Sequence, residues 1–130
     1  MAIPTPASRL QRRFIVMSGD ESLVARLNDA LPAGWDMVAA CDLETLGGFH
    51  DILQYRFILL DLDEHNAFDP LEVISQLRRE MMLNIAIICL GGAPDVRDEA
   101  RLARADRFFE RGEAVAKMKV FCDQYGWGGE

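Results

Sequence analysis

Acidic residues stand in this sequence where two of its apolar segments end. Asp20 and Glu21 follow the first apolar segment closely, and Asp61 and Asp63 follow the third. If these segments are parallel strands, their carboxyl ends meet at one edge of the sheet and the carboxylates converge there. Clustered carboxylates repel one another unless a cation or a basic side chain neutralises them, and hard oxygen ligands suit Mg²⁺. This edge is therefore a candidate Mg²⁺ site.

Simpler structural roles would also account for these acids. Turns are often acidic, and Asp20 and Asp63 would then only cap helices. Asp61 would pair with Arg111, which follows the last short apolar segment, because a buried carboxylate without a partner is costly. His65 lies beside Asp63, but no second histidine stands at ligand spacing, which favours an exposed loop residue over a metal ligand.

The composition is typical of one ordinary globular domain. The chain has 130 residues, of which 50% are hydrophobic and 27% charged, which suffices for one hydrophobic core. The net charge of −7 argues against nucleic acid as a partner, because a phosphate backbone requires a basic face. We interpret the basic residues Arg9, Arg12 and Arg13 as a solvated lead-in to the first strand, with a partner contact as the alternative.

No part of the sequence predicts a membrane span or a signal peptide. No apolar stretch approaches the roughly 18 residues of a span, and the N-terminus lacks the apolar core of a signal peptide. Cys41, Cys89 and Cys122 are an odd number without metal-ligand spacing, and Cys89 lies in an apolar run where a small buried thiol fits. We therefore expect a reduced, cytoplasmic setting with no membrane contact.

Apolar runs and amphipathic segments alternate along the chain. Five short apolar runs are typical of strands in a parallel sheet that is covered on both faces: 13–17, 35–40, 57–60, 85–90 and 106–109. Five segments have helical character: 23–31, 42–54, 70–79, 94–104 and 113–125. Parallel strands require crossover helices, so the alternation predicts an α/β domain with helices on both sides of the sheet. Residues 1–12 are expected to form a flexible arm and 126–130 a short tail.

Leu59, Leu60 and Asp61 close the third strand of this fivefold pattern, and they resemble the phospho-acceptor strand of bacterial response-regulator receiver domains. The resemblance covers about residues 13–125. It implies a flavodoxin-like (βα)5 fold, a doubly wound parallel sheet with strand order 2-1-3-4-5, and it implies that Asp61 is the phospho-acceptor. Most of the other diagnostic positions of the family differ in this sequence.

Receivers hold Mg²⁺ with two adjacent acids after the first strand. Matching the apolar face of the first helix places Gly19 and Asp20 at these positions, so that one acid is lost. A register shifted by one residue would place Ser18 and Gly19 there and lose both, while Glu21 is a candidate substitute. The resemblance thus implies a Mg²⁺ site that is weak or absent. Its ligands would be Asp20, Glu21, Asp61 and Asp63.

The positions that couple phosphorylation to the rest of a receiver are also altered. The hydroxyl residue after the fourth strand corresponds to Gly91, and the small residue beside it to Gly92. The lysine after the fifth strand corresponds to Arg111, which keeps the positive charge but not the compact ammonium group. Phe108 falls at the position of the switch aromatic, with ordinary core packing as the alternative. We therefore expect phosphorylation at Asp61 to be weakened or lost.

The resemblance implies a divergent, stand-alone receiver in two-component-type signal transduction, which is not an enzyme and acts mainly through protein partners. A histidine kinase or a phosphotransfer protein is a candidate partner, and a homodimer is another. Receivers commonly bind partners through the region of the fourth and fifth helices, where mixed charges suit a symmetric dimer or a plain solvated face. The residues of this predicted surface are Arg97, Arg101, Leu102, Arg104 and Arg107.

The alternative function is a small flavodoxin-like enzyme or a nucleotide- or cofactor-binding domain. Gly91 and Gly92 would let a phosphate approach a helix N-terminus. However, the sequence has no GxGxxG motif after the first strand, no P-loop GK[ST] motif, no evident Ser/His/Asp order and no Asp-x-His-x-x-Gly signature of corrinoid-binding domains. These features favour the receiver interpretation.

Overall fold

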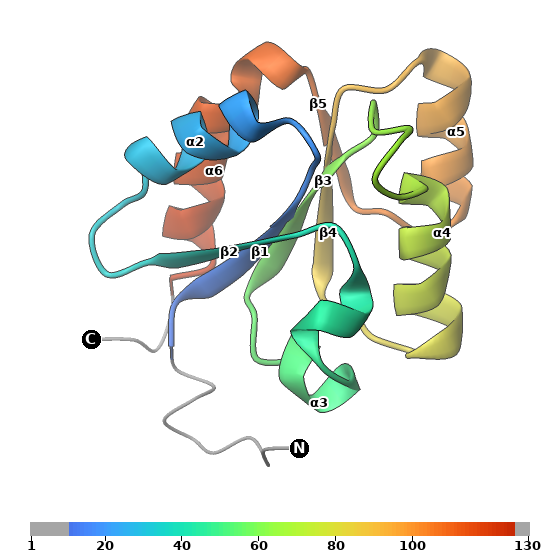
Figure 1. The fold of residues 1–130 in the computed structure, drawn as a ribbon, viewed down its shortest axis with the longest axis horizontal. Helices are drawn as coiled ribbons and strands as arrows, with labels where there is room; N and C mark the ends of the chain where they lie inside the picture. The colour runs from blue at the N-terminus through green and yellow to red at the C-terminus, as the bar shows by residue number, and fades with distance from the viewer. Residues whose placement is uncertain (1–10, 127–130) are drawn as a thin grey trace.

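Five apolar segments of the chain form one parallel sheet (Figure 1). The computed structural model describes residues 11–126. The strands are β1 (Arg13–Met17), β2 (Asp36–Ala40), β3 (Phe57–Asp61), β4 (Ala86–Leu90) and β5 (Arg107–Phe109). All pairings are parallel and the order is β2-β1-β3-β4-β5. The predicted flavodoxin-like α/β fold and its strand order are confirmed.

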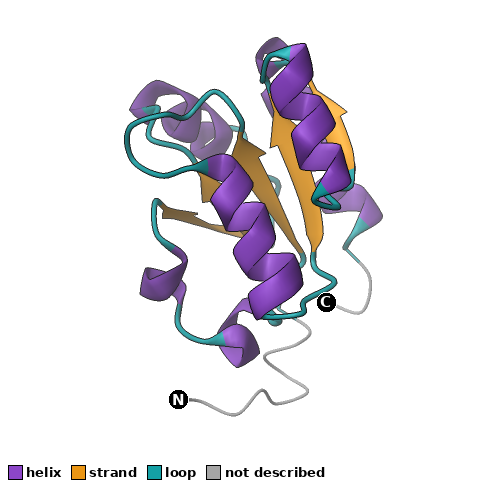
Figure 2. Cartoon of the chain, turned by 90° about the vertical axis from the view of Figure 1, so that its right-hand side faces the viewer, coloured by secondary structure: helices purple, strands orange, loops and turns teal. Residues whose placement is uncertain are grey.

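Helices cover both faces of the sheet, which explains why the central strands are continuously apolar. One face carries α2 (Glu21–Asp29) and α6 (Ala114–Gln124). The other carries α3 (Phe49–Ile52), α4 (Pro70–Ser75) and α5 (Pro94–Leu102), of which α4 and α5 are nearest the viewer in Figure 2. Every residue of β3 is buried, so this strand holds its last residue, Asp61, at the centre of the sheet.

Two of the predicted helices are altered in the structure. Between β2 and β3, Gly47 adopts a positive φ and separates a short 3-10 helix, η1 (Leu43–Leu46), from the single turn of α3. The predicted helical segment 42–54 is therefore divided into two short pieces. The predicted helix 70–79 begins as α4 but ends in a π-helical segment, η2 (Gln76–Glu80), which apolar periodicity did not predict.

The π-helical segment carries a buried arginine, Arg78. Its guanidinium donates to the carbonyl oxygens of Leu83 and Ile85, at 2.7 and 2.9 Å, and to that of Arg104 at 3.0 Å. It also pairs with Asp106 at 2.8 Å, whose carboxylate accepts a further bond from the backbone N–H of Ile87. Arg78 thus ties together the loops at the end of the sheet opposite Asp61.

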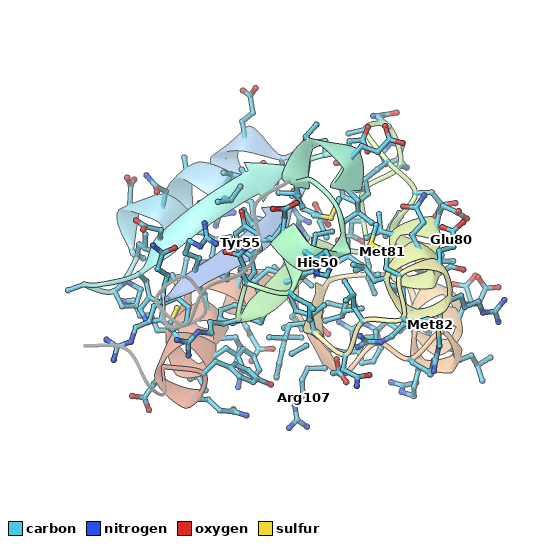
Figure 3. All side chains as sticks on the ribbon, turned by 90° about the horizontal axis from the view of Figure 1, so that it is seen from below. His50, Tyr55, Glu80, Met81, Met82 and Arg107 are labelled. Carbon is cyan, nitrogen blue, oxygen red and sulfur yellow. The ribbon has the colours of Figure 1, made fainter. Side chains whose placement is uncertain are left out.

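Figure 3 shows that opposite end from below, with Glu80, Met81 and Met82 at the end of η2 and Arg107 at the start of β5. Met82 is 80% exposed and has a φ of 54°, a left-handed conformation that is unusual for a side chain of its size.

Within the described range, no helix has the length and hydrophobicity needed to cross a bilayer. The predicted arm 1–12 and tail 126–130 lie almost entirely outside this range, as does Arg9.

Candidate functional site

The carboxylate of Asp61 is buried at the carboxyl end of β3, and its oxygens are already hydrogen-bonded. The residue is 3% exposed. Oδ2 accepts from the hydroxyl of Ser18 at 2.7 Å, and Oδ1 accepts from the backbone N–H of Asp63 at 3.0 Å. The guanidinium of Arg111 also donates to Oδ1. Asp61 therefore faces the turn after β1, as the convergence of strand ends predicted, and it has three donors around it.

Arg111 follows the edge strand β5 and bridges the acids of the site. It begins η3 (Arg111–Glu113), one residue beyond the end of β5, and one of its terminal nitrogens lies 2.5 Å from Oδ2 of Asp20. The other contacts Asp61 and is 3.7 Å from Oδ2 of Asp63. Partial burial opposes the charge on Arg111, but the carboxylates of Asp61 and Asp20 outweigh it and raise its pKa. Asp61 and Arg111 therefore form the ion pair that was the structural alternative to a metal site.

Asp20 has two roles at once. It is the N-cap of α2, where its Oδ1 accepts the backbone N–H of Leu23 at 3.2 Å, so the predicted capping role is confirmed. Its second oxygen pairs with Arg111. The bond from Leu23, supported by the guanidinium of Arg111, lowers the pKa of the Asp20 carboxyl. Asp20 thus caps α2 and also belongs to the group of carboxylates around Arg111.

Asp63 does not cap a helix. One oxygen of its carboxylate accepts the backbone N–H of Gly92 at 3.0 Å, and the other faces Arg111. The next helix, α4, is capped instead by Asp69, which accepts from Leu71. Asp63 therefore connects the loop after β3 to the loop after β4.

Glu64 closes the rim of the site by accepting hydrogen bonds from several backbone N–H groups. Its carboxylate accepts from Ala67 and Asn66, each at 2.9 Å, from Gly19 at 2.7 Å and from His65 at 3.2 Å. These bonds, led by those from Ala67 and Asn66, lower the pKa of Glu64 to about 2. The loop 64–67 is thus fastened to the turn after β1.

We expect Glu64→Gln to lower the free energy of unfolding by about 1–2 kcal/mol at pH 7, a value reduced for partial solvent exposure. The folded-state pKa of about 2 lies below the ordinary value of 4.5, so the carboxylate stabilises the fold above pH 4.5 and loses this effect as the pH falls towards 2. Urea unfolding at several pH values should show the two proteins converging in this window. Glu80→Gln, at an exposed residue, is the control. A pH-independent difference would contradict the prediction.

The pocket at this edge has a volume of about 320 Å³. It is lined by residues from the turn after β1, the loop after β3 and η3: Gly19, Asp20, Asp61, Asp63, Glu64, His65, Asn66, Ala67 and Arg111. Glu21 is exposed on the first turn of α2 and is not among them, so its predicted place beside the other acids is not supported. His65 is exposed, as predicted for a loop histidine.

The arrangement does not fit a bound Mg²⁺ ion. Across residues 11–126, no group of three or more acidic, histidine or cysteine side chains is arranged to hold a metal. The guanidinium of Arg111 lies between Asp20 and Asp61, where it supplies the positive charge that the clustered carboxylates require. Neutralisation by a basic side chain is thus the solution that the geometry favours.

The glycines after β4 are required by the backbone. Gly91 has a φ of 73° and Gly92 a φ of 90°, where residues with a side chain are strained. A Cβ at Gly91 would also collide with the carboxylate of Asp63 and approach the side chain of Arg111. The absent side chain at position 91 therefore provides the space in which Asp63 and Arg111 meet.

Gly91→Ala is expected to destabilise the fold by about 1–2 kcal/mol, because it adds backbone strain and displaces Asp63. Gly112→Ala is the matched control, since a Cβ there meets no atom within 4 Å and its φ is not in the left-handed region. Denaturant unfolding of both variants measures the difference. Equal stability of the two would show that position 91 tolerates a side chain.

The predicted interaction surface divides into an inward and an outward part. Arg97 donates to the carbonyl oxygens of Gly91, at 2.8 Å, and of Phe109, at 3.2 Å, so it holds strand ends together rather than facing a partner. Leu102 is 84% exposed, as predicted for an apolar contact residue. The guanidinium of Arg101 lies 4.7 Å from the ring centre of Phe108. Phe108 is partly buried and packs against the core, as the core-packing alternative predicted.

Sequence reasoning missed three contributors to this end of the sheet. Ser18 was considered only as an alternative metal-site position, yet it donates to Asp61. No role is predicted for Glu64, and Arg97 is placed on a predicted partner surface, although both bind backbone groups of the site loops. The position of Ser18 directly after a buried strand was an available signal. The roles of Glu64 and Arg97 have no local sequence signal.

Neither a protein-family model nor a curated protein sequence matches the chain. Solved structures do match it. The signal receiver domain of a modulated diguanylate cyclase from Desulfovibrio desulfuricans G20 has a TM-score of 0.65 at 16% identity, over 88% of this chain and 92% of that one. A CheY-like protein, tadZ, from Pseudomonas aeruginosa PAO1 has a TM-score of 0.64 at 17% identity, over 89% and 94%. The chain has the receiver fold.

A third match is the phosphorylated cyanobacterial phytochrome response regulator RcpA. Its TM-score is 0.61 at 12% identity, over 89% of each chain. At such low identity, the likeness establishes the receiver fold alone. What the altered site of this receiver fold does must be argued from its own residues.

Proposed function

We propose that this chain is a divergent receiver-fold module of two-component-type signal transduction, which acts by binding protein partners and is not an enzyme. We further propose that phosphorylation at Asp61 is weakened or lost. The observation that carries the proposal is the bridge from Arg111 to Asp61 and Asp20. A histidine kinase or phosphotransfer protein of the same pathway is the class of partner expected for such a module.

The first argument concerns the nucleophile. Phosphoryl transfer to a carboxylate depends on positioning and on neutralisation of the phosphoryl charge. Ser18, the backbone N–H of Asp63 and Arg111 all donate to Asp61, so an incoming phosphoryl group must displace at least one of them. Breaking a partly buried charge pair is costly, which opposes the reaction before any bond to phosphorus forms.

The second argument concerns the groups that would stabilise an acyl phosphate. Three donors lie at this edge of the sheet, namely the backbone N–H groups of Gly92 and Gly19 and the guanidinium of Arg111. Each of them is already engaged by a carboxylate of the chain itself, from Asp63, Glu64, or Asp20 and Asp61. Gly91 supplies no hydroxyl to bond a phosphoryl oxygen. A phosphoryl group on Asp61 would therefore enter a pocket that is crowded with negative charge.

Treatment with acetyl phosphate and Mg²⁺, followed by intact mass measurement, tests the proposal. We expect little or no added phosphoryl mass on the wild type. The double variant Gly19→Asp/Arg111→Lys introduces the second acid and the lysine of the receiver pattern, and it should gain modification that Asp61→Asn abolishes. Stoichiometric, Mg²⁺-dependent phosphorylation of wild-type Asp61 would overturn the proposal, whatever the double variant does.

A further inference from the structure

Two loops at the end of the sheet opposite Asp61 leave apolar side chains partly in water. Leu53 and Tyr55 lie in the loop that leads into β3, and Met81 and Met82 in the loop that leads into β4. The loops are neighbours, because β3 and β4 pair with each other from their first residues. Leu53 is 50% exposed and Met82 80%. Tyr55 and Met81 are partly buried against the same core cluster, and Figure 3 shows them at this end of the molecule. We call these four residues the apolar end face.

Met82 combines a strained backbone with an apolar side chain in water. It follows η2 with a φ of 54°, and the N–H of Leu83 donates to the carbonyl of Leu77 at 2.8 Å, so the chain leaves the helix through a left-handed residue. Glycine or asparagine usually occupies such a position, because a larger side chain there is strained. A segment that covered Met82 would remove its exposed apolar surface from water.

The chain enters the described structure beside this face. The carbonyl of Gln11 accepts from the guanidinium of Arg56 at 3.2 Å, and Arg56 directly follows Tyr55. The guanidinium of Arg13 lies 4.7 Å from the centre of the Tyr55 ring. In Figure 1, β1 accordingly begins at the lower end of the sheet. Residues 1–10 therefore join the described chain next to one member of the apolar end face.

The sequence of residues 1–10 suits an apolar contact. It contains Met1, Ile3 and Leu10 with two alanines and two prolines, and its one charged side chain is that of Arg9. A segment without acidic residues is not repelled by a chain whose net charge is −7. Each proline fixes one backbone dihedral, which reduces the conformational entropy that binding would cost.

The segment is also long enough to cross the face. Ten extended residues span up to about 33 Å, whereas the radius of gyration of a domain of this size is about 14 Å. Leu10 immediately precedes Gln11 and so lies within reach of Tyr55. Ile3, seven residues further along the chain, has the reach to contact Met82.

We propose that residues 1–10 bind the apolar end face of their own chain, with Leu10 against Tyr55 and Ile3 against Met82. Such binding replaces the flexible arm that the sequence alone leads us to expect. It covers an apolar surface that would otherwise be open to a second copy or to another protein. The inference goes beyond the proposed function, because it concerns the end of the sheet opposite Asp61.

The rate at which dilute hydrogen peroxide oxidises Met82 tests the proposal. Peroxide transfers one oxygen atom to an accessible thioether sulfur and is reduced to water, and peptide masses report the sulfoxide at each methionine. The reference is the thioether introduced by Ser22→Met, at an exposed residue on the first turn of α2. In the full-length chain, Met82 should oxidise about fivefold more slowly than this reference, as a segment bound for about four-fifths of the time requires.

Two double variants of the segment identify what covers Met82. Ile3→Asp/Leu10→Asp removes both apolar contacts and should raise the oxidation rate of Met82 to that of the reference. Thr5→Asp/Ser8→Asp adds the same charge at polar residues and should leave Met82 slow to oxidise. Circular dichroism melting confirms that both variants are folded.

Three results would overturn the inference. Met82 could oxidise as fast as the reference in the full-length chain, or its protection could survive Ile3→Asp/Leu10→Asp. Protection that rises with protein concentration between about 5 and 200 µM would show instead that a second copy covers the face. None of these measurements depends on whether Asp61 is phosphorylated, so this inference and the proposed function fail separately.

Discussion

Arg111→Ala is expected to lower the free energy of unfolding by about 3 kcal/mol at pH 7. The variant removes the cation that lies between two carboxylates, one of which belongs to Asp61, whose side chain is only 4% exposed. A buried carboxylate without a partner is far costlier than the ion pair that it replaces. Urea denaturation measures the loss. Arg107→Ala, at an exposed arginine of β5, is the control and should change stability by less than about 0.5 kcal/mol.

Two further measurements separate the charge effect from simple loss of packing. Asp61→Asn/Arg111→Met removes the buried charge together with its partner, so it should recover much of the stability that Arg111→Ala loses. Millimolar Mg²⁺ should raise the melting temperature of Arg111→Ala but not that of the wild type, because the carboxylates then lack a neutralising group. If Arg111→Ala matches Arg107→Ala in stability, the bridge does not support the fold.

Arg78→Met is expected to cost about 3–5 kcal/mol, the largest effect among these substitutions. The substitution keeps an apolar side chain of similar length but leaves the carbonyl oxygens of Leu83, Ile85 and Arg104 without their shared donor. It also leaves Asp106 without its cation. Arg79→Met changes the exposed neighbouring arginine and should be nearly neutral.

Hydrogen exchange locates the damage. The amide of Ile87 donates to Asp106, which Arg78 orients, so this amide should exchange faster in Arg78→Met. The exchange rates of the β1 amides should keep the same relation to the rate set by global unfolding. A small stability loss equal to that of Arg79→Met would show that water replaces the guanidinium at this end of the sheet.

Much of the architecture could be predicted because its signals are local. The apolar runs of β1, β3 and β4 lack polar alternation, which two covered sheet faces explain, and the alternation with helices leaves few topologies. Where contacts between distant residues act on a segment, prediction from its local pattern was less complete. The π-helical segment η2 follows an uninterrupted helical pattern, and it contains a buried arginine whose partners lie up to 28 residues away.

The sequence by itself determined the parallel sheet and the meeting of Asp20, Asp61 and Asp63 at one edge, because strand periodicity and the direction of parallel strands follow from local hydrophobicity. Only the tertiary structure decided how those charges are neutralised. Arg111 is separated from Asp61 by 50 residues and from Asp20 by 91, and no local pattern encodes which donor reaches which carboxylate. That choice depends on the packing of three strand ends around Gly91, where an added Cβ would collide with the carboxylate of Asp63 and press on the side chain of Arg111.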